Sequence, residues 1–290
     1  MIRLGFSVDL HYDVSAPGAD FIFNVQAAST RQQRVLNENL KVSQPVMLNA
    51  HTDPVSRARY LRLQASPGPL HLHYDAVVEL DHHVAAPATL QEVPIGQLPP
   101  AVLPFLYPSR YCESDTLGAL AMQHFGSLPP GYQRVVAVRN WVQQHVQFKS
   151  NTSTGTTSAR DTLAIGAGVC RDSAHVMIAL CRALNIPARF ATGFDHGADP
   201  ALGPPDFHAY VEAYVGQRWY LFDPSGTAIP MAFVRLATGH DASDAAFATI
   251  FGKVGCPPPV VWTQVLPDAT GRLQMPFHTT DALSTDSGDF

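Results

Sequence analysis

The sequence predicts an α+β protein in which a β-sandwich precedes a domain of helices packed on an antiparallel sheet. The first observation is period-2 alternation of apolar and polar residues over residues 1 to about 100, in short segments separated by Pro, Gly, Asn and Asp turns. The second is a change to helical spacing at about residue 104, with alternating segments returning near residue 188. Several short strands at such spacing are typical of a sandwich.

The individual elements follow from the same patterns. The strands predicted in the first part include RLGFSVDLHYDV, DFIFNVQAA, RARYLRLQA and LHLHYDAVVEL. The proline-rich stretch APATLQEVPIGQLPPAVLPFLYPS is interpreted as a linker. Helices are predicted in SDTLGALAMQHF, in GYQRVVAVRNWVQQHV, at about 170–184 and in DASDAAFATIFG, and strands in ARFATGF, DFHAYVEAYV, RWYLFDPS and PVVWTQVL. We therefore expect a β-sandwich domain at 1–100, a second domain at 101–267 and a mobile tail at 268–290.

Composition and charge narrow the class of protein. The chain has 290 residues, of which 46% are hydrophobic and 15% charged, and this composition is typical of a chain with a folded core. The net charge is −5 and no basic block occurs, so neither nucleic acid nor a membrane is expected as a partner. The first residues lack the apolar run of a signal peptide, and no stretch is long enough for a membrane span, so we expect a cytoplasmic protein. The four cysteines show no C-x-x-C spacing, so neither disulfides nor a bound metal or other cofactor is predicted.

Cys170 lies at the start of the helix predicted at 170–184. The first turn of a helix carries partial positive charge and free N–H groups, which favour a thiolate and can stabilise an oxyanion. Gly166 and Gly168 just before it permit a close approach of the chain. On position alone, a buried cysteine that fills the core is the commoner interpretation. Cys181, in the middle of the apolar face, fits that interpretation better.

A hairpin brings two further polar residues together. Gly216-Gln217 separates two apolar runs and is typical of a two-residue turn. Val215 then pairs with Arg218, which puts His208 and Asp223 on one face as diagonal neighbours. A slip of one residue would put them on opposite faces. A surface pair or a core histidine with a satisfied hydrogen bond is together about as common an outcome as a functional pair.

The three residues together indicate chemistry more specifically than any one of them. A cysteine at a helix start, a histidine on a strand and an aspartate on its hairpin partner provide nucleophile, base and orienting group. The aspartate would keep one ring nitrogen of His208 protonated, so that the other nitrogen is available for the proton of the Cys170 thiol.

The motifs GVCRDSAHVMIALCRALNIPAR, HAYVE and WYLFDPS resemble those of the bacterial transglutaminase-like superfamily. The β-rich first 100 residues and the segment ATGHDASDAAFATIFG are also similar to that family, so the resemblance covers most of the chain. It implies a papain-like α+β core with Cys170, His208 and Asp223 in the catalytic positions. Ser173, Tyr210 and Phe194 depart from the aromatic residue, tryptophan and tyrosine usual at those positions, which concerns substrate preference.

The resulting hypothesis is thiol-dependent acyl transfer at amide bonds of peptides or proteins through a thioester. Water as the acceptor gives a protease or amidase, which is our first choice, and an amine gives a transglutaminase. A non-catalytic protein-binding module with a vestigial triad is the alternative from another class.

Several other polar and aromatic residues have alternative structural or functional interpretations. Trp141 is expected in the core, and Glu212 shares the strand face of His208. His175 could face either the site or the solvent. His71 and His73 share a strand face as metal ligands can, but without an evident third ligand they are interpreted as a strand surface.

Overall fold

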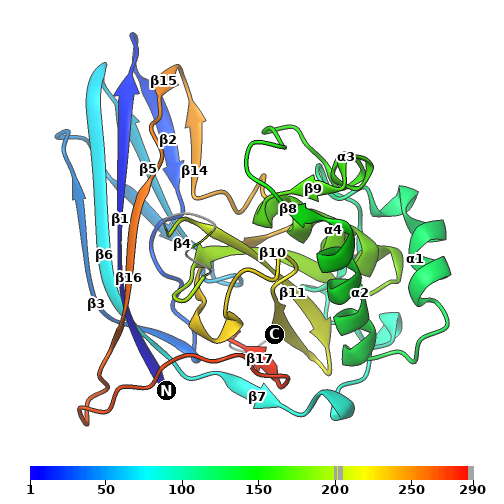
Figure 1. The fold of residues 1–290 in the computed structure, drawn as a ribbon. Coiled ribbons are helices and arrows are strands. Elements are labelled where there is room, and N and C mark those ends of the chain that lie inside the picture. The colour runs from blue at the N-terminus through cyan, green and yellow to red at the C-terminus, as the bar shows by residue number, and fades with distance from the viewer. Residues whose placement is uncertain (199–200, 202–204, 287–290) are drawn as a thin grey trace.

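The structure, a computed structural model, describes residues 1–198, 201 and 205–286. A β-sandwich stands beside a second sheet, and the helices cover the far side of that sheet (Figure 1). This arrangement confirms the α+β class predicted from the sequence.

Two antiparallel sheets make up the sandwich. The first has the order β15-β1-β6-β3, with β16 also pairing with β1, and the second has the order β14-β2-β5-β4. The alternating apolar residues of these strands form one continuous core between the sheets. The strands are β1 (Ile2–Val14), β2 (Ala19–Phe23), β3 (Gln33–Val42), β4 (Asn49–Thr52), β5 (Arg59–Ala65), β6 (Gly68–Leu80), β14 (Ala248–Phe251), β15 (Val254–Gly255) and β16 (Val260–Leu266).

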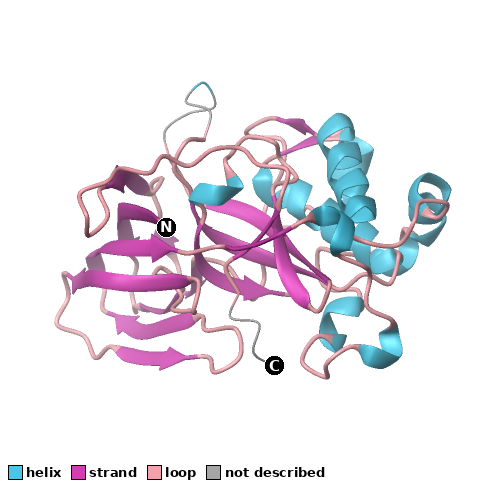
Figure 2. Cartoon of the chain, turned by 90° about the horizontal axis from the view of Figure 1, so that it is seen from below, coloured by secondary structure: helices cyan, strands magenta, loops and turns pink. Residues whose placement is uncertain are grey.

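The second half is a four-stranded antiparallel sheet with helices on one face. Its strand order is β12-β11-β10-β13, and Figure 2 shows the helices gathered on the side away from the sandwich. Buried residues of α4 share a hydrophobic cluster with every second residue of β11, such as Val211. The elements are α1 (Gly118–Phe125), α2 (Tyr132–His145), α3 (Ala159–Ile165), α4 (Cys170–Ala183), β10 (Ala188–Phe194), β11 (His208–Val215), β12 (Arg218–Phe222) and β13 (Val234–Gly239).

Short elements complete the fold. Two small strand pairs are β7 (His83–Ala85) with β17 (Ala282–Ser284), and β8 (Gln147–Phe148) with β9 (Ala167–Gly168). Single 3₁₀ turns lie at Pro87–Thr89, Ile95–Gln97, Leu103–Leu106, Ser114–Thr116 and Pro230–Ala232. No helix in the described part of the chain is long and apolar enough to cross a membrane.

The proline-rich connection between the two halves is packed along its length. Leu98 and Val102 are buried against Tyr214 and Trp219 on the second sheet. Pro87 and Pro104 lie in the first positions of 3₁₀ turns, where a missing N–H costs little. This segment therefore connects the halves as a fixed strap.

One predicted helix is absent. The segment DASDAAFATIFG was expected to be helical, but Ala248–Phe251 forms β14 and pairs with β2. The carboxylate of Asp241 accepts hydrogen bonds from the backbone N–H and the hydroxyl of Ser243, at 2.9 and 2.6 Å. Such local side-chain bonds compete with helix formation and favour a turn.

The end of the chain returns to the first half. β16 pairs with β1 from Arg3 opposite Leu266 to Asp9 opposite Val260. The sandwich is therefore built from strands that come before the second sheet in the sequence and from strands that come after it. These pairings cross the boundary expected at residue 100, and the division into independently folding domains stays a prediction.

Part of the segment expected to be a mobile tail is ordered. Ala282–Ser284 forms β17, which pairs with β7, and the side chains of this strand are buried. Residues 287–290 of that segment lie outside the described residues. The buried carboxylate of Asp286 explains the order, because it contacts the guanidinium groups of Arg189 and Arg235 on the second sheet.

Candidate active site

Cys170 is the first residue of α4, as the sequence predicted. The turn before it is tight, because a Cβ added at Gly168 would lie 2.6 Å from the Cβ of Asp172. The Asp172 carboxylate accepts a hydrogen bond from the N–H of Val169 at 2.9 Å and caps the helix start. The Cys170 side chain is half-buried, with its thiol in the turn whose N–H groups have no preceding helical carbonyl to bond.

The hairpin register is the one predicted. Val215 pairs with Arg218, and Val211 pairs with Phe222 at the other end of the ladder. Gly216 and Gln217 have φ of 55° and 61°, which is the left-handed conformation that a tight hairpin turn requires. His208 and Asp223 consequently lie on one face.

The structure brings Cys170, His208 and Asp223 together. His208 Nε2 lies 3.5 Å from Asp223 Oδ1, and the Cys170 thiol is near enough for its charge to raise the pKa of the ring. The hydroxyl of Ser225 donates to Asp223 Oδ1 at 2.6 Å, and the N–H of Ala228 donates to Asp223 Oδ2 at 3.0 Å. Asp223 is therefore fixed by donors other than the histidine.

Charge in the site favours the imidazolium form of His208. Burial alone would lower the pKa of His208, but the neighbouring Cys170 and the hydrogen bond with Asp223 raise that pKa well above its ordinary value. Burial alone would likewise raise the pKa of Asp223, yet the interaction with His208 lowers it. A negative carboxylate beside a positive ring is the state that these contacts stabilise.

Asp195 was missed by the sequence analysis. Its Oδ2 lies 3.6 Å from His208 Nδ1, so a second buried carboxylate faces the ring. Burial raises the pKa of Asp195, in contrast to that of Asp223. Asp195 follows β10, in which Gly193 pairs with His208. Asp195 could therefore have been found only from the pairing of β10 with β11, which the local sequence pattern does not reveal.

Glu212 and His175 make contacts that stabilise the fold. Glu212 does not approach His208, because its carboxylate binds Arg189 Nε at 2.7 Å and Arg235 Nη1 at 3.1 Å. His175 is fully buried, its Nε2 accepts from the N–H of Ala242 at 3.2 Å, and burial lowers its pKa to about 3. It faces neither the solvent nor the candidate site.

Two aromatic residues near the helices and the sheet have unpaired polar atoms. The Trp141 indole stacks on His145 with 3.9 Å between ring centroids and packs against the main core, as expected. Tyr210 lies edge-on to His208 at 4.7 Å. Among the described residues, no partner for Trp141 Nε1 or for the Tyr210 hydroxyl is present.

Comparison with known proteins identifies the family. The model of the transglutaminase-like superfamily matches residues 119–224, and that of the bacterial transglutaminase N-terminal domain matches residues 2–101. The solved structure of a protein from Cytophaga hutchinsonii, named a "Putative Cysteine Protease", is 37% identical to this chain with a TM-score of 0.89, and the similarity covers 98% of this chain and 97% of that one. The chain belongs to the transglutaminase-like superfamily.

More distant relatives of this transglutaminase-like protein were also found. Protein ML0607 of Mycobacterium leprae (strain TN) is 27% identical over 146 residues, which are 49% of this chain and about half, 52%, of that protein. The periplasmic domain of TgpA from Pseudomonas aeruginosa bound to ethylmercury is 18% identical with a TM-score of 0.40, over 79% of this chain and 92% of that one. Membership of the superfamily supports a thiol-dependent enzyme in general terms.

Proposed function

We propose that this transglutaminase-like protein hydrolyses amide bonds of peptides or proteins, with Cys170 as nucleophile, His208 as acid and base, and Asp223 as the orienting group. The observation that carries the proposal is the arrangement of Cys170 and Asp223 about one buried imidazole. A nucleophile paired with a base that a third group orients is the recurring arrangement of covalent acyl transfer.

The reaction would proceed in two steps. The Cys170 thiolate attacks the substrate carbonyl, and the tetrahedral intermediate collapses as the His208 imidazolium gives its proton to the leaving amine. The acyl group then remains on sulfur as a thioester. Neutral His208 takes a proton from a water molecule, the resulting hydroxide attacks the thioester, and the acid product leaves with Cys170 again a thiolate and His208 protonated.

The start of α4 would assist at the carbonyl oxygen. Negative charge develops on that oxygen in each tetrahedral intermediate, and free N–H groups in the first turn of a helix can donate hydrogen bonds to it. Because Cys170 is the first residue of α4, its own N–H lies close to the sulfur that attacks.

Water as acyl acceptor is supported by the relative from Cytophaga hutchinsonii, which is named a protease and aligns over almost the whole chain. An amine acceptor would make the same thioester into a transglutaminase intermediate. The peptide or protein substrate and the cytoplasmic location remain predictions from the sequence.

Substitution of the nucleophile tests the proposal. We expect Cys170→Ala to lose hydrolysis of a peptide library, measured by mass spectrometry of the products. Cys256→Ala is the matched control, because Cys256 is an exposed cysteine of the sandwich half and its removal should leave turnover unchanged. Full turnover by a folded Cys170→Ala protein would contradict the proposal.

Alkylation of the native protein gives a second readout. In iodoacetamide labelling near neutral pH, followed by peptide mapping, Cys170 should react first. Burial brings the pKa values of Cys112 and Cys181 to about 12, so these two thiols should react slowly. Cys256 is exposed but has a raised pKa, so it should react after Cys170 and before the buried pair. Adding a primary amine to the peptide assay then shows whether water or the amine accepts the acyl group. Products that have gained water support hydrolysis. Products that have gained only the amine would contradict hydrolysis and indicate transamidation.

A further inference from the structure

Four polar side chains form a compact group on the outer face of the sandwich, well away from Cys170. β1 and β6 pair antiparallel with His11 opposite His71 and Asp9 opposite His73. The residues that alternate with these four on both strands are buried in the sandwich core, so the four side chains point outward.

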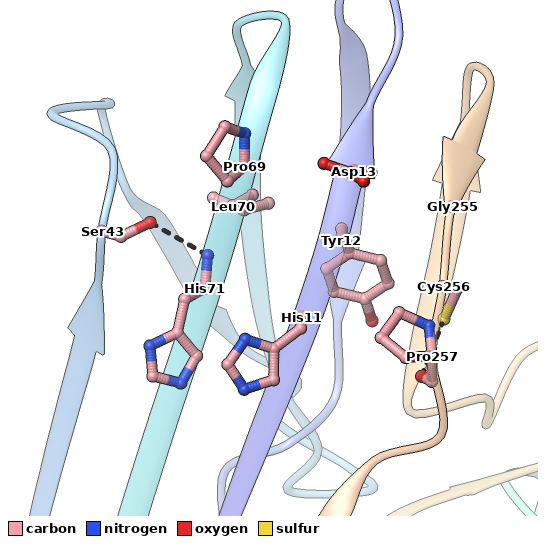
Figure 3. Close-up of a pocket in the computed structure, with 10 residues that line it drawn as sticks. All are labelled: His11, Tyr12, Asp13, Ser43, Pro69, Leu70, His71, Gly255, Cys256 and Pro257. Carbon is pink, nitrogen blue, oxygen red and sulfur yellow. Dashed lines mark hydrogen bonds between the residues drawn. The ribbon is translucent and has the colours of Figure 1, made fainter.

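The contacts within this group are short. His71 Nε2 lies 2.7 Å from Asp9 Oδ1, and His73 Nδ1 lies 2.9 Å from the same oxygen. The rings of His11 and His71 are parallel within 4° with their centroids 4.3 Å apart, and Figure 3 shows them side by side on neighbouring strands. Asp9, His11 and His71 each offer a ligand atom within 4.8 Å of the other two.

We propose that Asp9, His11 and His71 bind one divalent transition-metal ion, with Zn²⁺ as the reference ion, and that His73 orients the Asp9 carboxylate. Two imidazoles and one carboxylate are a common three-residue ligand set for zinc, and water completes the tetrahedron. The rings line a surface hollow of about 680 Å³ in which such a water has room. A carboxylate that binds a metal usually also accepts a hydrogen bond from another residue. His73 is placed to donate such a bond to Asp9.

The ligand chemistry defines which ions fit. Imidazole nitrogen suits Zn²⁺, Co²⁺, Ni²⁺ and Cu²⁺, whereas Mg²⁺ and Ca²⁺ prefer oxygen ligands. A simple surface His–Asp pair would account for His71 and Asp9. The lone pair of an imidazole nitrogen lies in the ring plane, so the stacked His11 and His71 rings must rotate about their side-chain bonds before both can bind one ion. The H-x-H pattern was visible in the sequence at His71 and His73, but the remaining ligands come from β1.

Binding at Nε2 would change the tautomer of His71. The hydrogen bond between His71 Nε2 and Asp9 places a proton on that nitrogen, so a neutral ring must carry its proton on Nδ1 before Nε2 can bind the metal. The ring then binds as neutral imidazole, and a doubly protonated ring, which forms at lower pH, has no free nitrogen for the ion. Zinc affinity should therefore fall as the pH is lowered.

Calorimetric titration with Zn²⁺ tests the site, using full-length chain in which Cys170→Ala and Cys256→Ser remove the two accessible thiols. We expect one ion per chain. His11→Ala and His71→Ala should each weaken binding by at least about tenfold, His73→Ala should weaken it less, and Asp9→Asn should weaken it without loss of side-chain volume. His51→Ala, on another exposed strand, is the control and should bind as the parent does.

Each outcome bears on the proposal. Loss of binding in the ligand variants but not in His51→Ala, with no competition from excess Mg²⁺, supports it. Unchanged stoichiometric binding in folded His11→Ala and His71→Ala proteins overturns it, and so does the absence of one-to-one binding in the parent. Visible absorption of bound Co²⁺ gives an independent measure of coordination. The site does not depend on catalysis by Cys170, so either proposal can fail alone.

Discussion

His208 lies between two carboxylates that differ in their surroundings. Asp223, near Nε2, accepts hydrogen bonds from Ser225 and Ala228 and has a lowered pKa, whereas Asp195, near Nδ1, has a pKa raised by burial. Opposite shifts in neighbouring acids are typical of sites that separate acid and base roles. The proposed function gives Asp223 the role of orienting the ring, and this role can be tested.

Asp223→Asn should shift the pH dependence of turnover. Asp223 raises the pKa of His208, so its replacement by a neutral amide should lower that pKa. The leaving amine needs the imidazolium, which is lost as pH rises through the His208 pKa, so the alkaline limb of kcat/KM should move to lower pH. We expect a rate loss of roughly 10²- to 10⁴-fold, measured from pH–rate profiles.

Asp195→Asn provides the comparison. Its charge contributes less to the His208 pKa than the contacts with Cys170 and Asp223 do, so the alkaline limb should move less. An equal or larger shift in Asp195→Asn would assign the orienting role to Asp195 instead.

The places of Cys170, His208 and Asp223 in the fold could be predicted from the sequence because each lies in a local pattern, whereas their catalytic roles stay a prediction. Cys170 opens a helix with regular apolar spacing, and the two-residue turn at Gly216 fixed the relation of His208 to Asp223. Asp195 directly follows β10, and its approach to His208 depends on the pairing of β10 with β11, which no local pattern encodes.

At the scale of elements, the turn into α4 determines where the thiol lies. Gly168 leaves no space for a side chain, since Asp172 folds back over it to cap the helix. Arg182, near the other end of α4, donates to the carbonyl oxygens of Ala188 and His240 at 3.0 and 2.6 Å. The start of the helix is thus capped locally, and its other end is fixed to the sheet by Arg182.

Gly168→Ala should displace the start of α4. The new Cβ would overlap the Asp172 side chain, so either the cap or the turn must move, at a cost of about 1–3 kcal/mol. Gly118→Ala, at the start of α1, is the control because nothing lies within 4 Å of the position of its Cβ. Denaturant unfolding and Cys170 alkylation rates should both change in Gly168→Ala alone, and native behaviour of that variant would argue against a packed turn.

Elements with strong periodicity matched the sequence best. α4 and β10 begin and end within a residue or so of prediction, because apolar spacing and burial coincide there. The helix expected in DASDAAFATIFG failed because its alanines imitate a helical face, while Asp241 and Asp244 bond to nearby backbone. Pairing with β2 then decides the strand, and that contact is not local.

At the scale of the whole molecule, a buried ionic network joins the second sheet to the C-terminal segment. Arg189 Nη2 lies 3.0 Å and Arg235 Nη1 lies 3.1 Å from Asp286 Oδ1, and Glu212 contacts both guanidinium groups. Burial alone would raise the pKa of Asp286, but the two arginines lower it. The C-terminal segment therefore supplies a negative charge that partly neutralises the buried arginines of the second sheet.

Asp286→Ala should destabilise the protein by about 3–5 kcal/mol at neutral pH, because it leaves buried guanidinium charge uncompensated. A lowered pKa means that this stabilisation is present above the unfolded value of about 3.9 and is lost as pH falls through the folded value. The difference from the native protein should therefore shrink in acid. Urea unfolding at two pH values measures both effects, and exposed Asp281→Ala is the control.

The overall class was predictable, but the way in which the halves interlock was not. Alternation and turn residues identify strands without telling which strands pair. Arg3 pairs with Leu266, and the Phe194 ring of β10 packs 4.9 Å from that of Phe6 in β1. These contacts join distant parts of the sequence. They cross the expected boundary between the sandwich and the second domain.

The pairing of β1 with β16 has a consequence for synthesis on the ribosome. β1 emerges early, and its neighbour β16 emerges only after the whole second half has been translated. At about 5–20 residues per second, the edge of β1 waits on the order of ten to fifty seconds for its partner. During that interval an apolar strand edge is open to other nascent chains, so a chaperone that shields the first hundred residues would raise the yield of folded protein.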